Sequence, residues 1–286
     1  MNWQQDVFPE VAEALELGGS LGRVGYVALR PLRNWSLRRG RQTVVLGSRM
    51  ADVVNRLGVG RDRIAVIPNW AADDIAPLAA EENPLRRRWG LSHRLVVGYA
   101  GNLGRAHDIA TVLAAMRALK ASPLDEQAAS ITFLFVGGGA LRATLEAETK
   151  RMEFANVLFQ DYQPRAQLSQ VLSAADVHLV MLNPKLEGLI VPSKIYAIAA
   201  AGRPAIFIGS RSGEVAQLLD EQGWGFCVKP SHGAELAQRI LQLAREPHLR
   251  KVMGERARAA SLHALDRASA VARWEALLGS LGAAPR

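Results

Sequence analysis

The stretch LVVGYAGNLGRAHD, residues 95–108, reads as a β-strand that ends in a glycine-containing turn just before a helix. Glycine lets backbone N–H groups approach an anion closely, and the N-terminus of a helix adds partial positive charge. Arg105 in this turn is suited to pair with a phosphate through two parallel hydrogen bonds. Asp108, which precedes Thr111, is expected to cap the helix rather than to bind a ligand.

A second strand-to-helix turn reads FVGGGA at residues 135–140. A Gly-Gly-Gly turn is weak evidence for a ligand, because tight connections use glycine without binding anything. The turn also lacks the Gly-x-Gly-x-x-Gly spacing of dinucleotide-binding loops and the Gly-Lys-Ser/Thr ending of a phosphate loop.

The third turn, EGLIVPSKIY at residues 187–196, joins a buried strand to a helix. Its Leu-Ile-Val run lies in a loop, where burial against a ligand or a partner explains it better than solvent exposure. Ser193 and Lys194 at the helix start supply a hydroxyl, N–H groups and a cation suited to a diphosphate. The alternative for Lys194 is a solvated side chain, which its place in an apolar loop at a strand's carboxyl end disfavours.

From Arg41 onward, short apolar or β-branched runs alternate with segments of helical period. Strands separated by helices imply right-handed crossovers and a parallel sheet covered on both faces, so the expected fold class is α/β. The expected strands are residues 43–46, 64–67, 95–99, 131–136, 157–159, 177–181, 204–208 and 225–228. The expected helices are residues 109–121, 139–154, 166–174, 194–201, 214–222, 232–245 and 249–281.

The clearest break in the chain is the polar run that follows Pro68-Asn69-Trp70. We therefore expect residues 1–70 as one unit, a linker at 71–93, a nucleotide-binding α/β domain at 94–265 and a C-terminal helix at 266–286. Only one or two expected strands precede the linker, which is thin for an independent core.

The composition is that of a globular protein with anionic partners. Of the 286 residues 49% are hydrophobic, and 35 Lys+Arg against 27 Asp+Glu leave a formal net charge of +8. The first ten residues lack the basic start and the apolar run of a signal peptide, so we expect a cytoplasmic protein. The single cysteine, Cys227, lies in an apolar setting that favours a core position over an activated thiol.

A basic amphipathic stretch lies near the N-terminus. It combines six arginines with apolar residues: Arg23, Arg30, Arg33, Arg38, Arg39 and Arg41 with Tyr26, Leu29, Leu32, Trp35 and Leu37. A surface helix packed on its own domain and a helix docked on a membrane surface both fit this pattern. Nucleic-acid binding is disfavoured, because aromatic residues are scattered and make up only 6% of the chain.

Five loop motifs in a fixed order carry a family resemblance. They are IPNW at residues 67–70, GYAGNLGR at 98–105, FVGGG at 135–139, VPSKIY at 191–196 and AGRP at 201–204. In this order they resemble the group-1, family-four retaining glycosyltransferases of the GT-B fold, and most of all bacterial members that build exopolysaccharide, capsule or O-antigen. QDVFPE at residues 5–10 and VLGSRM at 45–50 resemble loops found late in that family's N-terminal domain.

The resemblance implies both a fold and a donor site. The fold is a Rossmann-like parallel-sheet domain, the C-terminal half of GT-B, with residues 1–70 as a remnant of the N-terminal Rossmann domain. Arg105, Lys194 and Glu187 are the implied catalytic residues: the two cations neutralise the leaving diphosphate, and Glu187 approaches the sugar. Residues 160–163 match the loop that reads the nucleobase. The implied donor-binding residues are Gly101, Asn102, Gly104, His107, Gly137, Gly138, Asp161, Tyr162, Leu189, Ile190, Val191 and Ser193.

Four positions depart from the family pattern. The family commonly has an arginine and a lysine where this chain has Asn102 and His107, and two glutamates where it has Leu189 and Ala197. Glu187 is therefore an approximate substitute for the first glutamate, and the ribose contact lacks its carboxylate. His107 suits a contact with phosphate or sugar, and it equally suits a structural role at the helix start.

The resemblance implies transfer of a sugar from a UDP- or GDP-linked donor to a saccharide or lipid-linked acceptor. No cofactor and no metal are expected, and association with the inner membrane face is expected to be peripheral. Most of the N-terminal Rossmann domain would precede Met1, so the chain is expected to be a C-terminal fragment or to rely on a partner subunit for that half. The alternative function is a non-catalytic nucleotide-sugar-binding subunit.

Overall fold

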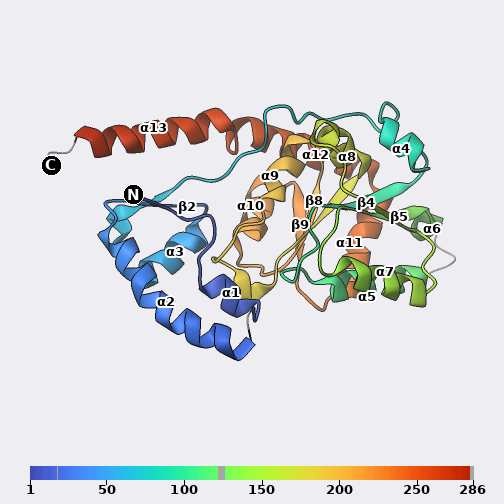
Figure 1. Cartoon of the computed structure of the whole chain (residues 1–286). Coiled ribbons are helices and arrows are strands. Elements are labelled where there is room, and N and C mark those ends of the chain that lie inside the picture. The colour runs from blue at the N-terminus through green and yellow to red at the C-terminus, as the bar shows by residue number, and fades with distance from the viewer. Residues whose placement is uncertain (18, 122–125, 284–286) are drawn as a thin grey trace.

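The computed structural model describes residues 1–17, 19–121 and 126–283 and contains two parallel β-sheets (Figure 1). The smaller sheet has the strand order β1-β2-β3, and the larger has the order β6-β5-β4-β7-β8-β9. Strands within each sheet pair in parallel. The α/β fold class predicted from the alternation of strands and helices is thus confirmed.

The larger sheet forms because its strands are apolar on both faces. In β4, Leu95 and Val97 enter the core on one face, while Val96 enters the core on the other. The strand order places β4 beside β7 at the centre, which is the switch point where doubly wound sheets bind ligands. The strands are β4 Leu95–Ala100, β5 Ile131–Val136, β6 Val157–Gln160, β7 Val177–Met181, β8 Ala205–Ile208 and β9 Gly225–Val228.

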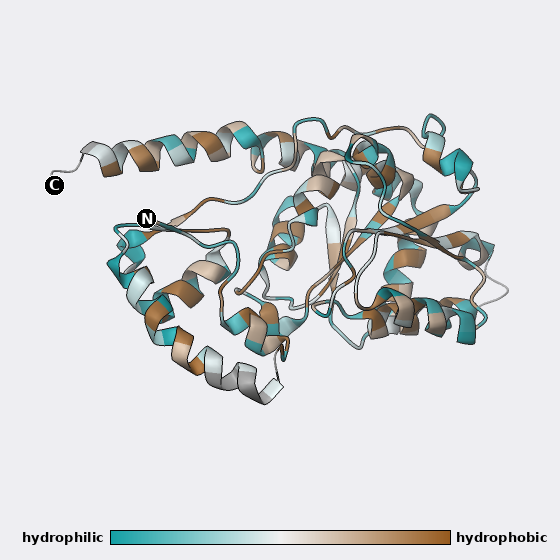
Figure 2. Cartoon of the chain, viewed as in Figure 1, coloured by the Kyte–Doolittle hydropathy of each residue, from teal (hydrophilic) through white to brown (hydrophobic). Residues whose placement is uncertain are grey.

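Helices cover both faces of the larger sheet (Figure 1). One face carries α5 Ile109–Lys120, α6 Glu126–Ser130, α7 Arg142–Arg151 and α11 Gly233–Arg245. The other carries α4 Pro84–Arg88, α8 Leu168–Ala174, α9 Lys194–Ala200, α10 Glu214–Gln222 and α12 Pro247–His263. Hydrophobic residues concentrate on the strands that lie between these layers (Figure 2).

The smaller sheet lies between two helices. Val45 packs with Met50 of α3 on one face, and Val44 packs with Ala270 of α13 on the other. Figure 1 shows α13 extending away from the larger sheet toward the smaller one. The elements are β1 Asn2–Trp3, β2 Thr43–Val45, β3 Ile64–Val66, α1 Glu10–Ala14, α2 Gly19–Arg39, α3 Ser48–Arg56 and α13 Arg267–Ala283. Three short 3-10 turns, η1 Arg61–Arg63, η2 Arg165–Gln167 and η3 Pro184–Leu186, complete the fold.

All eight predicted strands are present, and each end lies within one residue of its predicted position. The sequence did not indicate β1, because two residues are too short to show a period. The predicted helix at 139–154 begins only at Arg142, since Gly139 has a φ of +127° that a helix excludes. The predicted helical region 249–281 is two helices, because the Asp266 carboxylate accepts from Ser269 N–H at 2.8 Å and starts α13.

The helices α1, α3, α4 and α6 were not expected from the sequence. Residues 284–286 of the predicted C-terminal helix lie outside the described residues. Among the helices that the structure describes, none is both long enough and apolar enough to cross a bilayer.

Candidate functional site

The loops after β4 and β5 pack directly against each other. Gly101 N–H donates to the Val136 carbonyl at 2.9 Å, and Leu103 N–H donates to the Gly138 carbonyl at 2.7 Å. A Cβ on Gly137 would lie 2.4 Å from the Gly101 carbonyl oxygen, and φ at this position is +125°. The glycines of the second turn thus have a packing reason, and donor contacts of Gly137 and Gly138 stay predictions.

The loop after β6 holds an exposed aromatic ring over these glycines. Tyr162 is 62% exposed, and its ring lies 3.1 and 3.2 Å from where Cβ atoms on Gly137 and Gly138 would stand. Arg142 secures the loop by donating to the Gly137 carbonyl and to Asp161 Oδ1, the latter at 2.7 Å. The structure therefore brings Asp161 and Tyr162 to the glycine turn, together with Arg142, which sequence reasoning missed.

Lys194, the first residue of α9, lies against the β4 loop. Its ammonium donates to the Tyr99 hydroxyl and lies 3.7 Å from the centroid of the Tyr99 ring. The Tyr99 hydroxyl is 2.7 Å from the Asn102 carbonyl oxygen and 3.1 Å from His107 Nε2. His107 Nδ1 donates to the Gly104 carbonyl at 2.8 Å. Three predicted site residues, Lys194, Asn102 and His107, thus contact one tyrosine that the sequence did not single out.

Burial determines the protonation of this cluster. It lowers the pKa of Lys194 to about 7, and no carboxylate among the described residues counteracts it. The pKa of His107 falls to about 4, through burial first and the Lys194 charge second, against a smaller rise from the Gly104 carbonyl. His107 is therefore neutral at pH 7, and with its proton on Nδ1 its Nε2 is a hydrogen-bond acceptor. Nε2 and the Asn102 carbonyl are alternative acceptors for the one proton of the Tyr99 hydroxyl. Lys194 is the residue of this cluster that titrates near pH 7.

Glu187 caps helix α10. Its Oε1 accepts from Glu214 N–H at 2.9 Å, and a Cβ on Gly213 would lie 2.2 Å from its carboxylate. Burial raises the pKa of Glu187, and repulsion by Glu214 adds to the rise. The carboxylate thus has a structural partner, and its contact with a sugar stays a prediction.

Glu214, the neighbour of Glu187, connects helix α10 beside the larger sheet with helix α3 beside the smaller sheet. Its carboxylate accepts from Ser48 N–H and Ser48 Oγ, both at 3.1 Å, and from Arg49 N–H at 3.0 Å. These groups form the first turn of α3, where a negative charge is favoured. Sequence reasoning missed Glu214, because an acid in the first turn of a helix ordinarily indicates a contact within that helix alone.

The apolar loop 189–191 lies between the cores of the two sheets. Val7 N–H donates to the Leu189 carbonyl at 2.9 Å, and the Leu189 side chain packs against apolar clusters from both units. Val191 packs against the cluster beside the smaller sheet, and Ile190 against the one beside the larger. The expected partner of this apolar run is therefore the N-terminal part of the same chain, and donor contacts of Leu189, Ile190 and Val191 stay predictions.

Loops from both units meet at this edge. The side-chain amides of Gln5 and Asn69 exchange hydrogen bonds at 2.9 and 3.3 Å. Burial, together with Glu214, raises the pKa of Tyr196 to about 12, although a hydrogen bond from the Asn69 backbone opposes the rise. The QDVFPE, IPNW and VPSKIY motifs, far apart in the sequence, are thus neighbours in space.

The remaining predicted residues have simpler surroundings. Arg105 and Ser193 are exposed, and their roles toward a donor stay predictions. Asp108 caps α5 as expected, since its carboxylate accepts from Thr111 N–H at 3.2 Å and from Thr111 Oγ1 at 2.5 Å.

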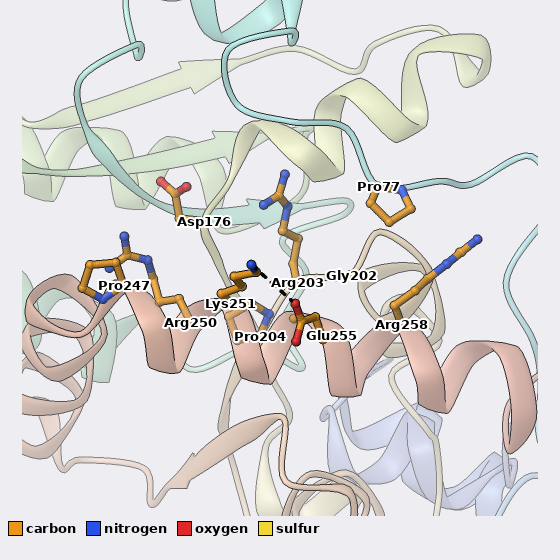
Figure 3. A pocket seen from close by; sticks show the side chains of 11 residues that line it. Pro77, Asp176, Gly202, Arg203, Pro204, Pro247, Arg250, Lys251, Glu255 and Arg258 are labelled. Carbon is orange, nitrogen blue, oxygen red and sulfur yellow. Dashed lines mark ion pairs between the residues drawn. The ribbon is translucent and has the colours of Figure 1, made fainter.

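A cavity of about 510 Å³ lies at the opposite end of the larger sheet, beside the amino ends of β7 and β8 (Figure 3). Two of its arginines donate hydrogen bonds to main-chain carbonyls near helix C-termini. Arg203 donates to the Ser173 carbonyl at 3.2 Å, and Arg258 donates to the Ala200 carbonyl at 2.7 Å. Ligands of doubly wound sheets bind at the carboxyl ends of the strands. The candidate donor site is therefore the edge that holds Lys194.

The chain matches a family model described as glycosyl transferases group 1 over residues 82–260. The probable glycosyltransferase WbjE of Pseudomonas aeruginosa is 29% identical over 238 residues. The putative colanic acid biosynthesis glycosyl transferase WcaI of Escherichia coli K12 is 27% identical over 243 residues. Each alignment covers 82% of this chain and 57% of the relative, so the chain spans little more than half the length of these relatives.

Solved structures share the fold at low sequence identity. Anabaena Alr3699/HepE, in a crystal with UDP and glucose, has a TM-score of 0.73 and 17% identity, over 90% of this chain and 67% of its own. WaaG, described as a glycosyltransferase involved in lipopolysaccharide biosynthesis, has a TM-score of 0.71 and 17% identity, over 94% and 73% of the two chains. These similarities support the Rossmann-like GT-B architecture that the motifs implied.

Proposed function

The chain belongs to the group 1 glycosyltransferases, and on this basis we propose that it transfers a sugar from a UDP- or GDP-linked donor to a saccharide or lipid-linked acceptor. We place this reaction in cell-surface polysaccharide synthesis at the inner membrane face. The names of WbjE and WcaI support the assignment, the second through its reference to colanic acid biosynthesis. The proposed transfer retains the anomeric configuration, as in family four, and uses neither a metal nor an organic cofactor.

The observation that carries the proposal is the half-buried ammonium of Lys194. Its charge is costly in this position, because burial is not offset by a carboxylate among the described residues. A diphosphate beside Nζ would supply the missing negative charge. Gly101 borders the ammonium, since a Cβ there would lie 3.7 Å from Nζ, and the absence of a side chain leaves room for the ligand.

The proposed transfer breaks the bond between the anomeric carbon and the diphosphate oxygen and forms a bond from the same carbon to an acceptor hydroxyl oxygen. The proton of that hydroxyl passes to the leaving diphosphate. The leaving diphosphate gains negative charge, which Lys194 and the exposed Arg105 stabilise electrostatically. Tyr99, held by His107 and the Asn102 carbonyl, orients the ammonium. Because its carboxylate caps α10, Glu187 is proposed to act by holding the 187–191 loop against the donor.

The proposed nucleobase site is the loop that carries Tyr162. An exposed aromatic ring offers a face on which a base can stack, and Arg142 fixes the loop through Asp161. Ala197 stands where the family has a ribose-binding glutamate and offers no side-chain acceptor. Ribose is therefore proposed to contribute less to donor affinity here than in relatives that keep the glutamate.

Calorimetric titration of the purified chain with UDP and with GDP tests donor binding. Replacing Lys194 with Gln removes a charge-assisted hydrogen bond, which is worth about 1.5–3 kcal/mol, so the affinity should fall roughly 10–100-fold. Lys185→Gln is the matched control, because Lys185 is an exposed lysine on the nearby turn η3 and its replacement should leave the affinity unchanged.

A chain that binds neither UDP nor GDP, or that loses the same affinity in both variants, would contradict the proposal. Turnover of a UDP- or GDP-sugar with saccharide and lipid-linked acceptors distinguishes the two candidate functions. Binding without turnover favours the alternative, a nucleotide-sugar-binding subunit that works with a partner.

A further inference from the structure

Helix α2 turns charged residues inward. Arg30 pairs with Glu13, and Arg33 donates to Glu10 at 2.6 Å; both acids belong to α1. Leu37 is buried on this inward side. The contacts that hold α2 on the protein are therefore ion pairs as much as apolar contacts, which is the reverse of an ordinary surface helix.

Large apolar side chains of the same helix are exposed. Hydrophobic and hydrophilic residues alternate along its ribbon (Figure 2). The exposed fractions are 64% for Val27, 53% for Leu29, 63% for Leu32 and 58% for Trp35. Single exposed apolar residues are ordinary on a protein surface, but several on one helix form a patch that indicates an interaction.

Arginines frame this outward patch. Arg38 and Arg39 are exposed at the end of the helix. Arg38 Nε donates to the Leu57 carbonyl at 3.1 Å, and the Arg39 guanidinium lies 5.7 Å from the centroid of the Trp35 ring. With Val27 and Pro31 they line a hollow of about 650 Å³. The sequence has no acidic residue between Glu16 and Asp52, so α2 itself adds no negative charge to this face.

We propose that the outward face of α2, defined by Val27, Leu29, Leu32, Trp35, Arg38 and Arg39, docks on a bilayer surface that contains anionic phospholipids. Such a surface offers an apolar layer and phosphate anions within the width of one helix. The apolar layer complements the apolar side chains of this face, and the phosphates complement its arginines. Trp35 and Leu32 enter the headgroup boundary, and Arg38 and Arg39 contact lipid phosphates. The inference adds a lipid class to the proposed function, and it does not depend on donor binding, because no residue of the Lys194 cluster belongs to α2.

Vesicle flotation tests the proposal with the full chain. Vesicles of phosphatidylcholine alone are compared with vesicles of equal parts phosphatidylcholine and phosphatidylglycerol, each at low and high salt. The chain should float with the anionic vesicles, about tenfold or more over the neutral ones, and high salt should release it. The double variants L32Q/W35Q and R38Q/R39Q should each lower the bound fraction about tenfold.

Leu262→Gln is the control, because Leu262 is an exposed apolar residue on α12. It should leave flotation unchanged, and all variants should keep the UDP affinity of the parent chain, which separates this test from that of the donor site. Absence of flotation, equal binding to both kinds of vesicle, or equal loss in the control would overturn the proposal. So would a dimer in vesicle-free solution that only L32Q/W35Q dissociates, since the face would then be an interface between two copies.

Discussion

Each end of the larger sheet holds a cation that is shielded from solvent, but the partners of the two cations differ. Arg86 is fully buried and Lys194 is half-buried. At the amino end, Arg86 donates to Asp176 at 3.0 Å and to the Ala174 carbonyl at 3.2 Å. At the carboxyl end, Lys194 meets the hydroxyl and ring of Tyr99 and no carboxylate among the described residues. A buried cation with an anionic partner stabilises the fold, whereas one without such a partner is available to an anionic ligand.

The largest expected effect tests the paired end. Arg86→Met should lower the free energy of unfolding by about 3–5 kcal/mol, because Asp176 and several carbonyls would stay buried without their donor. Urea unfolding followed by circular dichroism measures the change, with the exposed Arg88→Met as control. A loss as small as that of the control would show that Arg86 is not a stabilising charge.

The next effect has the opposite sign and tests the unpaired end. Lys194→Met removes a buried charge that has no counter-ion, so at pH 7 it should raise the free energy of unfolding by roughly 1–3 kcal/mol. The same urea experiment measures it. If the variant were less stable than the parent, Lys194 would belong with Arg86 as a structural cation and the contrast between the two ends would fail.

The pH dependence follows from the same lysine. Its pKa of about 7 in the folded chain lies below the ordinary 10.5, so between these values the unfolded chain binds more protons. The contribution of Lys194 therefore makes stability rise with pH from about 7 to about 10.5.

Binding of UDP should return the Lys194 amine to its protonated, charged form. Calorimetric titrations at pH 8 in two buffers of different ionisation enthalpy should therefore detect uptake of up to about one proton. Lys194→Gln should abolish this uptake; its persistence would assign the proton to another group.

The smallest expected effect concerns an exposed ion pair at the same edge. Asp161→Asn should change the free energy of unfolding by less than about 0.5 kcal/mol, because the Asp161 side chain is almost fully in solvent. Arg142 would still hold the loop through the Gly137 and Gln160 carbonyls. Thermal unfolding measures the change, and a loss above about 1 kcal/mol would show that the charge itself orders the loop.

Local features of the molecule were predictable wherever neighbouring residues decide the structure. The strand at 131–136 was predicted to the residue, because a strand buried on both faces is apolar throughout. The cap at Asp108 and the position of Lys194 at a helix start follow from turn and capping chemistry. The role of Glu214 was not predictable, since its partners in α3 lie about 165 residues earlier in the chain.

The sequence by itself determined the alternation of strands and helices, the order of the loops at the sheet edge and the presence of a lysine in one of them. These depend on period and turn chemistry within a few residues. Only the tertiary structure decided that Arg86 is paired and Lys194 is not, that Glu187 caps α10, and that α2 turns Arg30 and Arg33 toward α1. The physical reason is that the free energy of a charge depends on its burial and on partners from distant segments, which no local pattern contains.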